Sequence, residues 1–255
     1  MVESWVLRIF LFLGLTNAEY YSNIPTYIRI KGENVKNSRL IKDLLYEQVA
    51  RIAKAASSPK RLEIIEVLCQ GEKSVEQLAA DTDLSVKLTS AHLKELKSAR
   101  LVEARREGKY MYYRLVDVRV AELWVMLREL AEERLLELQS AMRELVHCPG
   151  ELAPVNGSDL LARAGSGEVV IIDVRPGSEY LAAHLPYARS LPLVELKQRL
   201  HELPRDKSIV AYCRGPFCLM AKEAVELLKK EGMQATRLEV GVIEWRLGGL
   251  PLAVA

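Results

Sequence analysis

The sequence has few cysteines, few histidines, a nearly balanced charge and no long apolar run, and each shortage excludes a class of protein. Four cysteines are too few for the disulfide framework of a secreted domain and suit a reducing cytoplasm. Together with four scattered histidines they form no metal cage, so we expect no metal and no cofactor. A net charge of +2 excludes a polycation, so any surface for nucleic acid must be local. The cysteines are Cys69, Cys148, Cys213 and Cys218.

The most apolar segment, residues 5–15, is too short to span a bilayer, although the small residues after it resemble a signal-peptide cleavage site. We prefer a different interpretation. Residues 31–33 can be encoded by a purine-rich ribosome-binding site, and Val35 would then be encoded by a GTG start codon. On this hypothesis residues 1–34 are an upstream extension, or a disordered segment, outside the natural protein. We therefore expect a cytoplasmic protein with no membrane segment.

Helix signals follow one another in the first half of the chain, which we predict to be a mainly-α domain over residues 35–146. Apolar side chains recur at helical spacing over residues 38–56. Two serines and a proline then predict the start of a second helix over residues 59–69, because proline fits the first helical position.

A helix-turn-helix follows this pair of helices. Residues 74–77 have the spacing of a capping box and open a short helix that extends to Ala80. Aspartates break it, and Ser85 caps the next helix, over residues 86–99. A short helix, a tight polar turn and a second helix is the layout of a DNA-reading motif.

A basic hairpin comes next and strengthens the DNA-binding interpretation. Residues 101–106 alternate like a strand, a Glu-Gly pair turns the chain, and residues 110–115 return as the second strand of a wing. Between Ser85 and Arg114 the basic residues exceed the acidic ones by five, on the second helix and the wing. A charged helix can also be merely a solvated face, but the combination favours DNA. The predicted DNA contacts are Lys87, Thr89, Ser90, His92, Lys94, Arg105, Arg106 and Lys109.

Residues 41–138 resemble the ArsR-type winged-helix repressors. The motifs that carry the resemblance are Ala56-Ser-Ser-Pro-Lys-Arg-Leu-Glu-Ile-Ile, residues 84–94 and residues 101–115. The resemblance implies a homodimer that binds an inverted-repeat operator in double-stranded DNA and is released by a signal.

This chain lacks the metal-sensing sites of the family, so we do not expect a metal ion to be the signal. Arsenic-sensing members carry Cys-x-Cys where this chain has Ser74 and Glu76, and Asp117 has no histidine partner of the zinc-sensing type on the last helix. Sulfur-sensing members use two cysteines, but Cys69 and Cys148 do not clearly match them in register. We interpret Cys69 as buried filler.

One long helix is predicted over residues 118–146. Its apolar residues supply more apolar surface than one small domain requires, which is explained either by core packing or by a dimer seam that this helix forms with the first helix. Residues 147–154 contain two prolines and a glycine and are predicted to be a linker.

The segment Ser208–Ala221 organises the second predicted domain, residues 155–255. An apolar run of β-branched residues predicts a buried strand that ends at Cys213, and Phe217 onward has helical spacing. A thiol between a strand and a helix N-terminus, with Arg214 beside it, should have a depressed pKa and react as a thiolate. The alternative is that Cys213 and Cys218 are small buried apolar residues.

This loop resembles the active-site loop of the single-domain rhodaneses, which are sulfurtransferases. Two flanking segments agree with that family: Val169–Pro186, and Gly241-Val-Ile-Glu-Trp245 with the Gly-Gly-Leu-Pro that follows. The resemblance implies an α/β domain with a parallel sheet and a persulfide-forming Cys213. It assigns Gly215, Pro216 and Phe217 to the loop and Asp173, Arg175 and His184 to its structural support.

Two departures from the rhodanese pattern affect the chemistry. Ala183 stands where a glycine is usual, and a second cysteine, Cys218, closes the loop. Phosphatases of this fold need an arginine at position 219, which is leucine here, so we exclude phosphatase chemistry on this loop.

We therefore predict a winged-helix repressor joined to a sulfur-handling domain. In the catalytic version, Cys213 attacks thiosulfate or polysulfide, Arg214 orients the donor, and Cys218 resolves the persulfide. In the alternative, the second domain is not an enzyme and only senses sulfur or oxidant. A third alternative makes it a dimerisation module.

Overall fold

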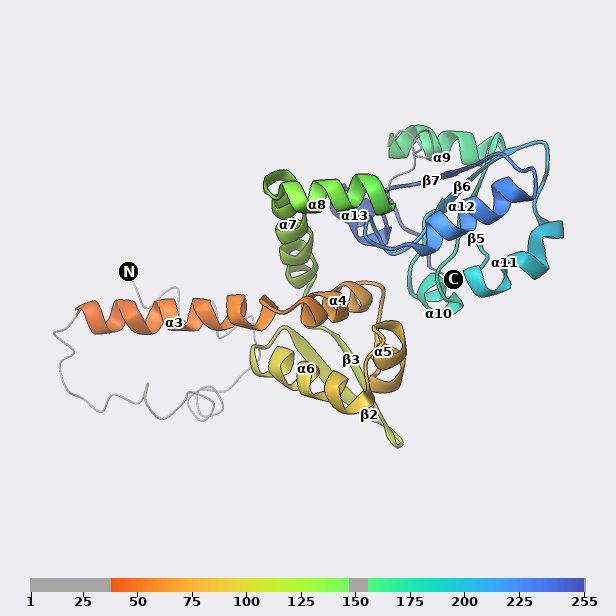
Figure 1. The fold of residues 1–255 in the computed structure, drawn as a ribbon. Helices are drawn as coiled ribbons and strands as arrows, with labels where there is room; N and C mark the ends of the chain where they lie inside the picture. Colours follow the sequence, from red (N-terminus) through yellow and green to blue (C-terminus); the bar gives the residue numbers. More distant parts are fainter. Residues whose placement is uncertain (1–37, 147–155, 255) are drawn as a thin grey trace. The chain divides into compact units, whose positions relative to one another are not determined.

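The computed structural model describes residues 38–146 and 156–254, which form two sets of elements (Figure 1). The predictions for residues 1–34 and for the linker 147–154 lie outside this range, as does Cys148. In the part that the structure describes, no helix is long and apolar enough to cross a membrane.

The first half contains the predicted helices, and two of them begin at the predicted capping residues. The helices are α3 (Ser38–Ala56), α4 (Pro59–Leu68), α5 (Val75–Asp81) and α6 (Val86–Ser98). Ser74 and Gln77 form the predicted capping box of α5, in which each side chain accepts from the other residue's backbone N–H. The Ser85 hydroxyl accepts from the N–H of Leu88 and caps α6. The predicted helix-turn-helix is confirmed.

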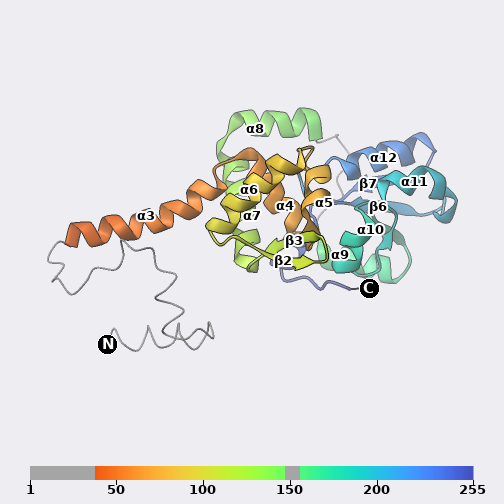
Figure 2. The same cartoon turned by 90° about the horizontal axis from the view of Figure 1, so that it is seen from below.

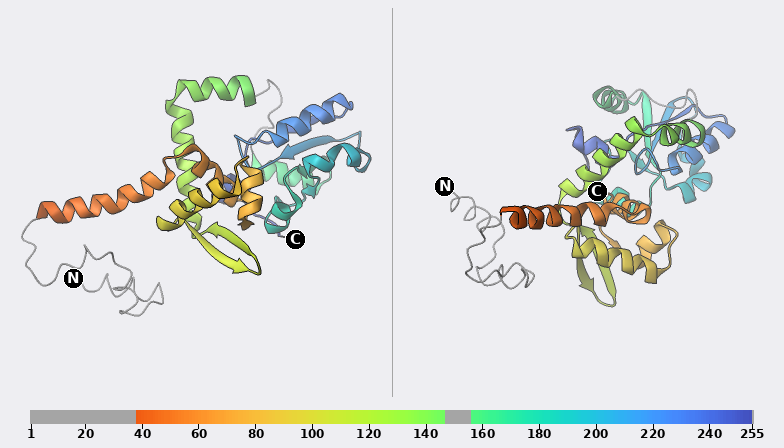
Figure 3. Two further views of the ribbon diagram at one scale, coloured as in Figure 1. Left: turned by 60° about the horizontal axis from the view of Figure 1, so that its bottom comes forward. Right: turned by 60° about the vertical axis from the view of Figure 1, so that its left-hand side comes forward.

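The wing is the predicted antiparallel hairpin. Strands β2 (Val102–Glu107) and β3 (Tyr110–Leu115) pair in register, and the short β1 (Lys73–Ser74) pairs with the other edge of β3. Gly108 makes the turn at φ +59°, a left-handed conformation that suits glycine. Figure 3 shows the hairpin projecting beyond α6.

The prediction of one continuous helix over residues 118–146 is wrong. The chain forms α7 (Val118–Arg134), then α8 (Leu136–Ala141) and a final turn at Met142–Val146. Leu135 has an extended backbone, and the Gln139 side chain donates to the carbonyl of Glu132, which the break leaves without its helical partner. Helices α7 and α8 therefore run in different directions (Figures 1 and 3).

The second half is the predicted α/β fold. Its parallel sheet has the strand order β5-β4-β6-β7, with β4 and β6 at the centre. Every residue of β4 is buried, as expected for a parallel strand covered on both faces. The strands are β4 (Val169–Asp173), β5 (Arg189–Ser190), β6 (Ser208–Tyr212) and β7 (Ala235–Arg237).

Alternate residues of the central strands pack against different helices. Ile172 and Ala211 contact the side covered by α11 and α12, whereas Ile171 and Tyr212 face α9 and α13. Figure 2 shows α11 and α12 side by side. The helices are α9 (Gly157–Gly165), α10 (Gly177–Ala182), α11 (Leu193–Arg199), α12 (Met220–Lys230) and α13 (Val242–Leu247).

Candidate active-site loop and DNA-binding surface

The reactive loop leaves the carboxyl end of β6, where a parallel sheet ordinarily presents its functional groups. Cys213 follows the strand directly and is 2% exposed. Helix α12 begins at Met220, three residues later than the sequence predicts, because Cys218 instead closes a turn by donating its N–H to the Gly215 carbonyl at 3.1 Å. The loop therefore includes both cysteines.

The two cysteines of this loop lie close together, with the Cys213 thiol 3.3 Å from the Cys218 carbonyl oxygen and 3.9 Å from the Gly215 carbonyl oxygen. Burial raises the pKa of Cys213, and the neighbouring Cys213 thiol lowers the pKa of Cys218 to about 7. The prediction that Cys213 itself has a depressed pKa is wrong for this arrangement, because the burial of Cys213 outweighs the loop amides.

Arg214 is held by carboxylates on two elements. Its guanidinium lies 2.6 Å from Glu179 Oε1, on α10, and 2.9 Å from Asp81 Oδ1, at the end of α5. These acids raise the pKa of Arg214 although burial acts to lower it. The guanidinium is thus already neutralised, and in this arrangement it is not available to orient an anionic donor, as the sequence had suggested.

The predicted supporting residues lie under the loop. Asp173 and Arg175 are fully buried and form an ion pair with an N–O distance of 2.5 Å. The Tyr212 hydroxyl donates to the same aspartate at 2.6 Å, which ties β6 to the end of β4. His184 stacks on Tyr180 at 3.8 Å and lies against the Tyr180 carbonyl. These contacts fix the two strand ends from which the loop starts.

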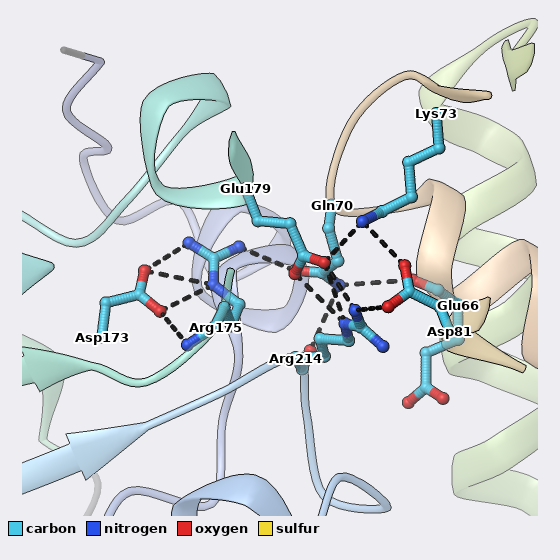
Figure 4. A network of polar contacts seen from close by, with 8 residues as sticks. All are labelled: Glu66, Gln70, Lys73, Asp81, Asp173, Arg175, Glu179 and Arg214. Carbon is cyan, nitrogen blue, oxygen red and sulfur yellow. Dashed lines mark hydrogen bonds and ion pairs between the residues drawn. The ribbon is translucent and has the colours of Figure 1, made fainter. Parts of the chain in front are cut away.

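Sequence reasoning missed the side chains that reach this loop from the winged-helix half. Gln70 accepts from Arg175 Nη1 at 2.8 Å and donates to the Arg214 carbonyl at 3.4 Å. Lys73 bridges Asp81 and Glu179 at 2.9 and 2.7 Å (Figure 4). Gln70 and Lys73 are polar but buried, and buried polar side chains usually have a specific partner. The sequence alone does not show that these two residues are buried.

Apolar contacts extend this junction. Phe217 packs on the core of the winged-helix half, and Ile243 of α13 is a buried member of that core. A Cβ at Gly241 would lie 2.1 Å from the Arg214 carbonyl oxygen, so only glycine lets the loop backbone approach α13 this closely. A cavity of about 960 Å³ lies beside the loop, and its lining includes Pro216 but neither cysteine of the loop.

The predicted DNA contacts on α6 fall into two groups. Lys87, Ser90 and Lys94 are exposed, and His92 is half-buried. Thr89 is fully buried, and its hydroxyl donates to the Ser85 carbonyl at 3.0 Å. The assignment of Thr89 to the DNA contacts is therefore wrong: it packs inside the helix-turn-helix.

The wing presents its predicted basic residues to solvent, but they differ in charge pairing. Arg105 is paired with Glu72 and with Glu107. Arg106 donates only to the backbone carbonyl of Gly108 among the interactions described, and the Lys109 ammonium lies 5.2 Å from the Tyr110 ring centre. Arg106 and Lys109 therefore have more charge to offer a phosphate than Arg105.

A winged helix-turn-helix followed by a parallel α/β domain with a cysteine loop defines a DNA-binding regulator joined to a rhodanese domain. Comparisons with known proteins agree. Residues 58–104 match the family described as "Bacterial regulatory protein, arsR family", and residues 157–247 match "Rhodanese-like domain". The HTH-type transcriptional regulator Rv0324 of Mycobacterium tuberculosis is 43% identical over 211 residues, which cover 83% of this chain and 92% of that protein. The chain belongs to the arsR family of bacterial regulatory proteins and carries a rhodanese-like domain.

Further relatives match one half each. A sulfurtransferase of Allochromatium vinosum is 30% identical over 90 residues, which cover 35% of this chain and 82% of that protein. The solution structure of the homodimeric winged helix-turn-helix domain of Mb0332 from Mycobacterium bovis is 41% identical, with a TM-score of 0.37, and covers 41% of this chain and 95% of that one.

Proposed function

We propose that this regulator is a repressor whose rhodanese domain takes up sulfane sulfur on Cys213 and thereby controls DNA binding. The observation that carries the proposal is the pair of cysteines in the loop after β6, where the Cys213 thiol lies 3.3 Å from the Cys218 carbonyl oxygen. Two thiols that meet in one loop suit the formation of a persulfide and its resolution by the second thiol.

The first step moves one sulfur atom to Cys213. Cys218, as thiolate, accepts the Cys213 proton. The Cys213 sulfur then attacks the outer sulfur of thiosulfate, forming a new S–S bond while the old one breaks, and sulfite leaves with the electron pair. With a polysulfide donor, the shortened polysulfide leaves in the same way. Loop amides would stabilise the terminal sulfur of the persulfide.

The second step converts the persulfide into a disulfide between the two cysteines. After Cys218 loses its proton again, its thiolate attacks the Cys213 sulfur, forms the Cys213–Cys218 disulfide and releases hydrosulfide. A cellular thiol must then reduce the disulfide before another cycle. Because reduced thiols and operator DNA are both found in the cytoplasm, we place the protein there.

A non-catalytic sensor is the second candidate, and the burial of Cys213 favours it. A thiol that is 2% exposed is poorly placed for rapid turnover. Steady-state turnover with thiosulfate and cyanide separates the two: an enzyme turns over many times, whereas a sensor takes up one sulfur per loop.

A homodimer on double-stranded DNA completes the proposal. Exposed apolar side chains on α7 and α8 support a dimer seam, because such side chains are otherwise buried. They are Met126, Leu127, Leu130 and Leu136, with Leu135 between the helices. Helix α6 and the wing would contact an inverted-repeat operator.

A gel shift on the gene's own upstream DNA, with and without polysulfide, tests the proposal. We expect a shifted band that polysulfide changes for the wild-type protein but not for Cys213→Ser. A protein that binds this DNA equally in both conditions would contradict the sulfur-controlled repressor.

A further inference from the structure

Four buried or half-buried charges join the sulfur loop to the helix-turn-helix. Arg214 and Lys73 supply two positive charges, and Asp81 and Glu179 supply two negative ones. Each cation contacts both anions at 2.6 to 2.9 Å (Figure 4). The cluster is neutral only while Arg214 remains in place.

Asp81 connects this cluster of charges to the helix-turn-helix. It is the last residue of α5, and the recognition helix α6 starts five residues later, at Val86. The short turn between them is fixed by Thr82, whose hydroxyl donates to the Leu78 carbonyl and whose own carbonyl accepts from Lys60. A movement of Asp81 would therefore change the angle between α5 and α6.

Arg214 connects the cluster to the reactive cysteine, because it directly follows Cys213 in the chain. Cys213 is buried, and its sulfur already lies 3.3 Å from the Cys218 carbonyl oxygen and 3.9 Å from the Gly215 carbonyl oxygen. An extra sulfur on Cys213 cannot enter so closely packed a loop without displacing the backbone next to it. Arg214, the next residue along the chain, has the charged side chain nearest to such a displacement.

We propose that Arg214 couples sulfur loading to operator release through Asp81. The proposal rests on the proposed function and specifies its internal route. In the reduced protein Arg214 holds the end of α5 and fixes the helix-turn-helix for DNA binding. When Cys213 carries a persulfide, the shift of the loop withdraws Arg214, and Lys73 alone faces two carboxylates. The excess negative charge moves Asp81 toward solvent and releases α5.

Asp81→Asn is the decisive variant, because it removes the charge without changing the size of the side chain. The exposed neighbour Asp83 provides a matched control, since Asp83→Asn makes the same charge change in the same turn. Fluorescence anisotropy with the upstream DNA, on full-length protein with and without polysulfide, gives the ratio of the two dissociation constants. Mass spectrometry of the same samples measures sulfur on Cys213.

We expect the wild-type protein and Asp83→Asn to lose at least about fivefold in DNA affinity on sulfur loading, the lower end of usual allosteric coupling. Asp81→Asn should take up the same sulfur and change its affinity by less than about twofold. An equal change in Asp81→Asn and the wild type would overturn the coupling alone. No sulfur uptake or no response in the wild type would overturn the proposed function and the coupling with it.

Hydrogen exchange provides a readout that does not depend on a variant. In the wild-type protein, sulfur loading should speed the exchange of the amides of α5 relative to those of α4 (Figure 4 shows the contacts that are lost). Unchanged exchange in α5, with Cys213 modified, would contradict the release of this helix.

Discussion

Phe217 of the sulfur loop meets Trp124 of α7 edge to face, with ring centroids 6.0 Å apart and planes inclined by 75°. An aromatic residue of the rhodanese loop thus packs on the core of the DNA-binding half. Such pairs add about 0.5–1.5 kcal/mol to the burial of their area.

Removal of the Phe217 ring should loosen the sulfur loop and make the Cys213 thiol more accessible. We expect Phe217→Ala to increase the rate of alkylation of Cys213 by iodoacetamide several-fold and to destabilise the protein by about 2–3 kcal/mol, less than a fully buried phenylalanine because Phe217 is partly buried. Leu219→Ala, at an exposed position of the same loop, is the control and should change neither value much. Equal alkylation rates in the wild type and Phe217→Ala would contradict this packing as the barrier.

Gly241 should tolerate no side chain. Because its absent Cβ would overlap the Arg214 carbonyl, Gly241→Ala must displace the sulfur loop. We expect a loss of about 1–3 kcal/mol in stability and slower sulfur uptake at Cys213, measured by urea unfolding and mass spectrometry. Gly232→Ala tests backbone strain alone, since open space surrounds that glycine at φ +78°. Unimpaired uptake in Gly241→Ala would show that the loop has more freedom than its packing indicates.

The buried carboxyl of Glu66 should make stability depend on pH. Burial, together with the charges of Cys218 and Glu244, raises the pKa of Glu66 from 4.5 to about 7, and its Oε1 has no partner among the described residues. Figure 4 shows this carboxyl apart from the ion-pair cluster. Between these two values the unfolded chain releases a proton that the folded protein keeps, so stability falls as pH rises, by up to about 3 kcal/mol.

Glu66→Gln should abolish this fall. The variant should match the wild type near pH 4 and be more stable above pH 7, as measured by urea midpoints across this range. Glu63→Gln, on the same helix with a side chain 38% exposed, should keep the wild-type profile. If Glu66→Gln has the pH profile of the wild type, the carboxyl is not held protonated in the folded protein.

The wing residues should differ in their effect on DNA binding. Arg106→Ala and Lys109→Ala should each reduce the slope of log affinity against log salt by about one unit per lost phosphate contact. Arg105→Ala should reduce it less, because Glu72 and Glu107 already neutralise that guanidinium. Salt titrations of the three variants decide this, and an equal reduction in all three would show that Arg105 leaves its acids on DNA.

Local signals in the sequence predicted most of the fold. The capping box at Ser74 and Gln77, the cap at Ser85 and the turn at Gly108 each depend on neighbouring residues, and each lies where predicted. The break at Leu135 has no such signal, because two adjacent leucines are compatible with a continuous helix. The break is visible only in the structure, in the extended backbone of Leu135.

The site was predictable in its residues but not in its pairings. The loop cysteines could be predicted because they lie between a strand and a helix. The contact between Arg214 and Asp81 could not, because these residues are 133 positions apart and no local pattern predicts it. The prediction of a depressed pKa for Cys213 was wrong because the thiol is buried in the core between the sheet and α12. The sequence of the loop does not show this burial.

Peptide mass spectrometry after polysulfide treatment tests most directly whether sulfur arrives on the rhodanese loop. We expect sulfur adducts on Cys213, or a Cys213–Cys218 disulfide, in the wild-type protein. We expect a persisting Cys213 persulfide in Cys218→Ser and no loop adduct in Cys213→Ser. Adducts on Cys69 or Cys148 with Cys213 unmodified would contradict the proposed function and place the sulfur sensor in another part of the chain.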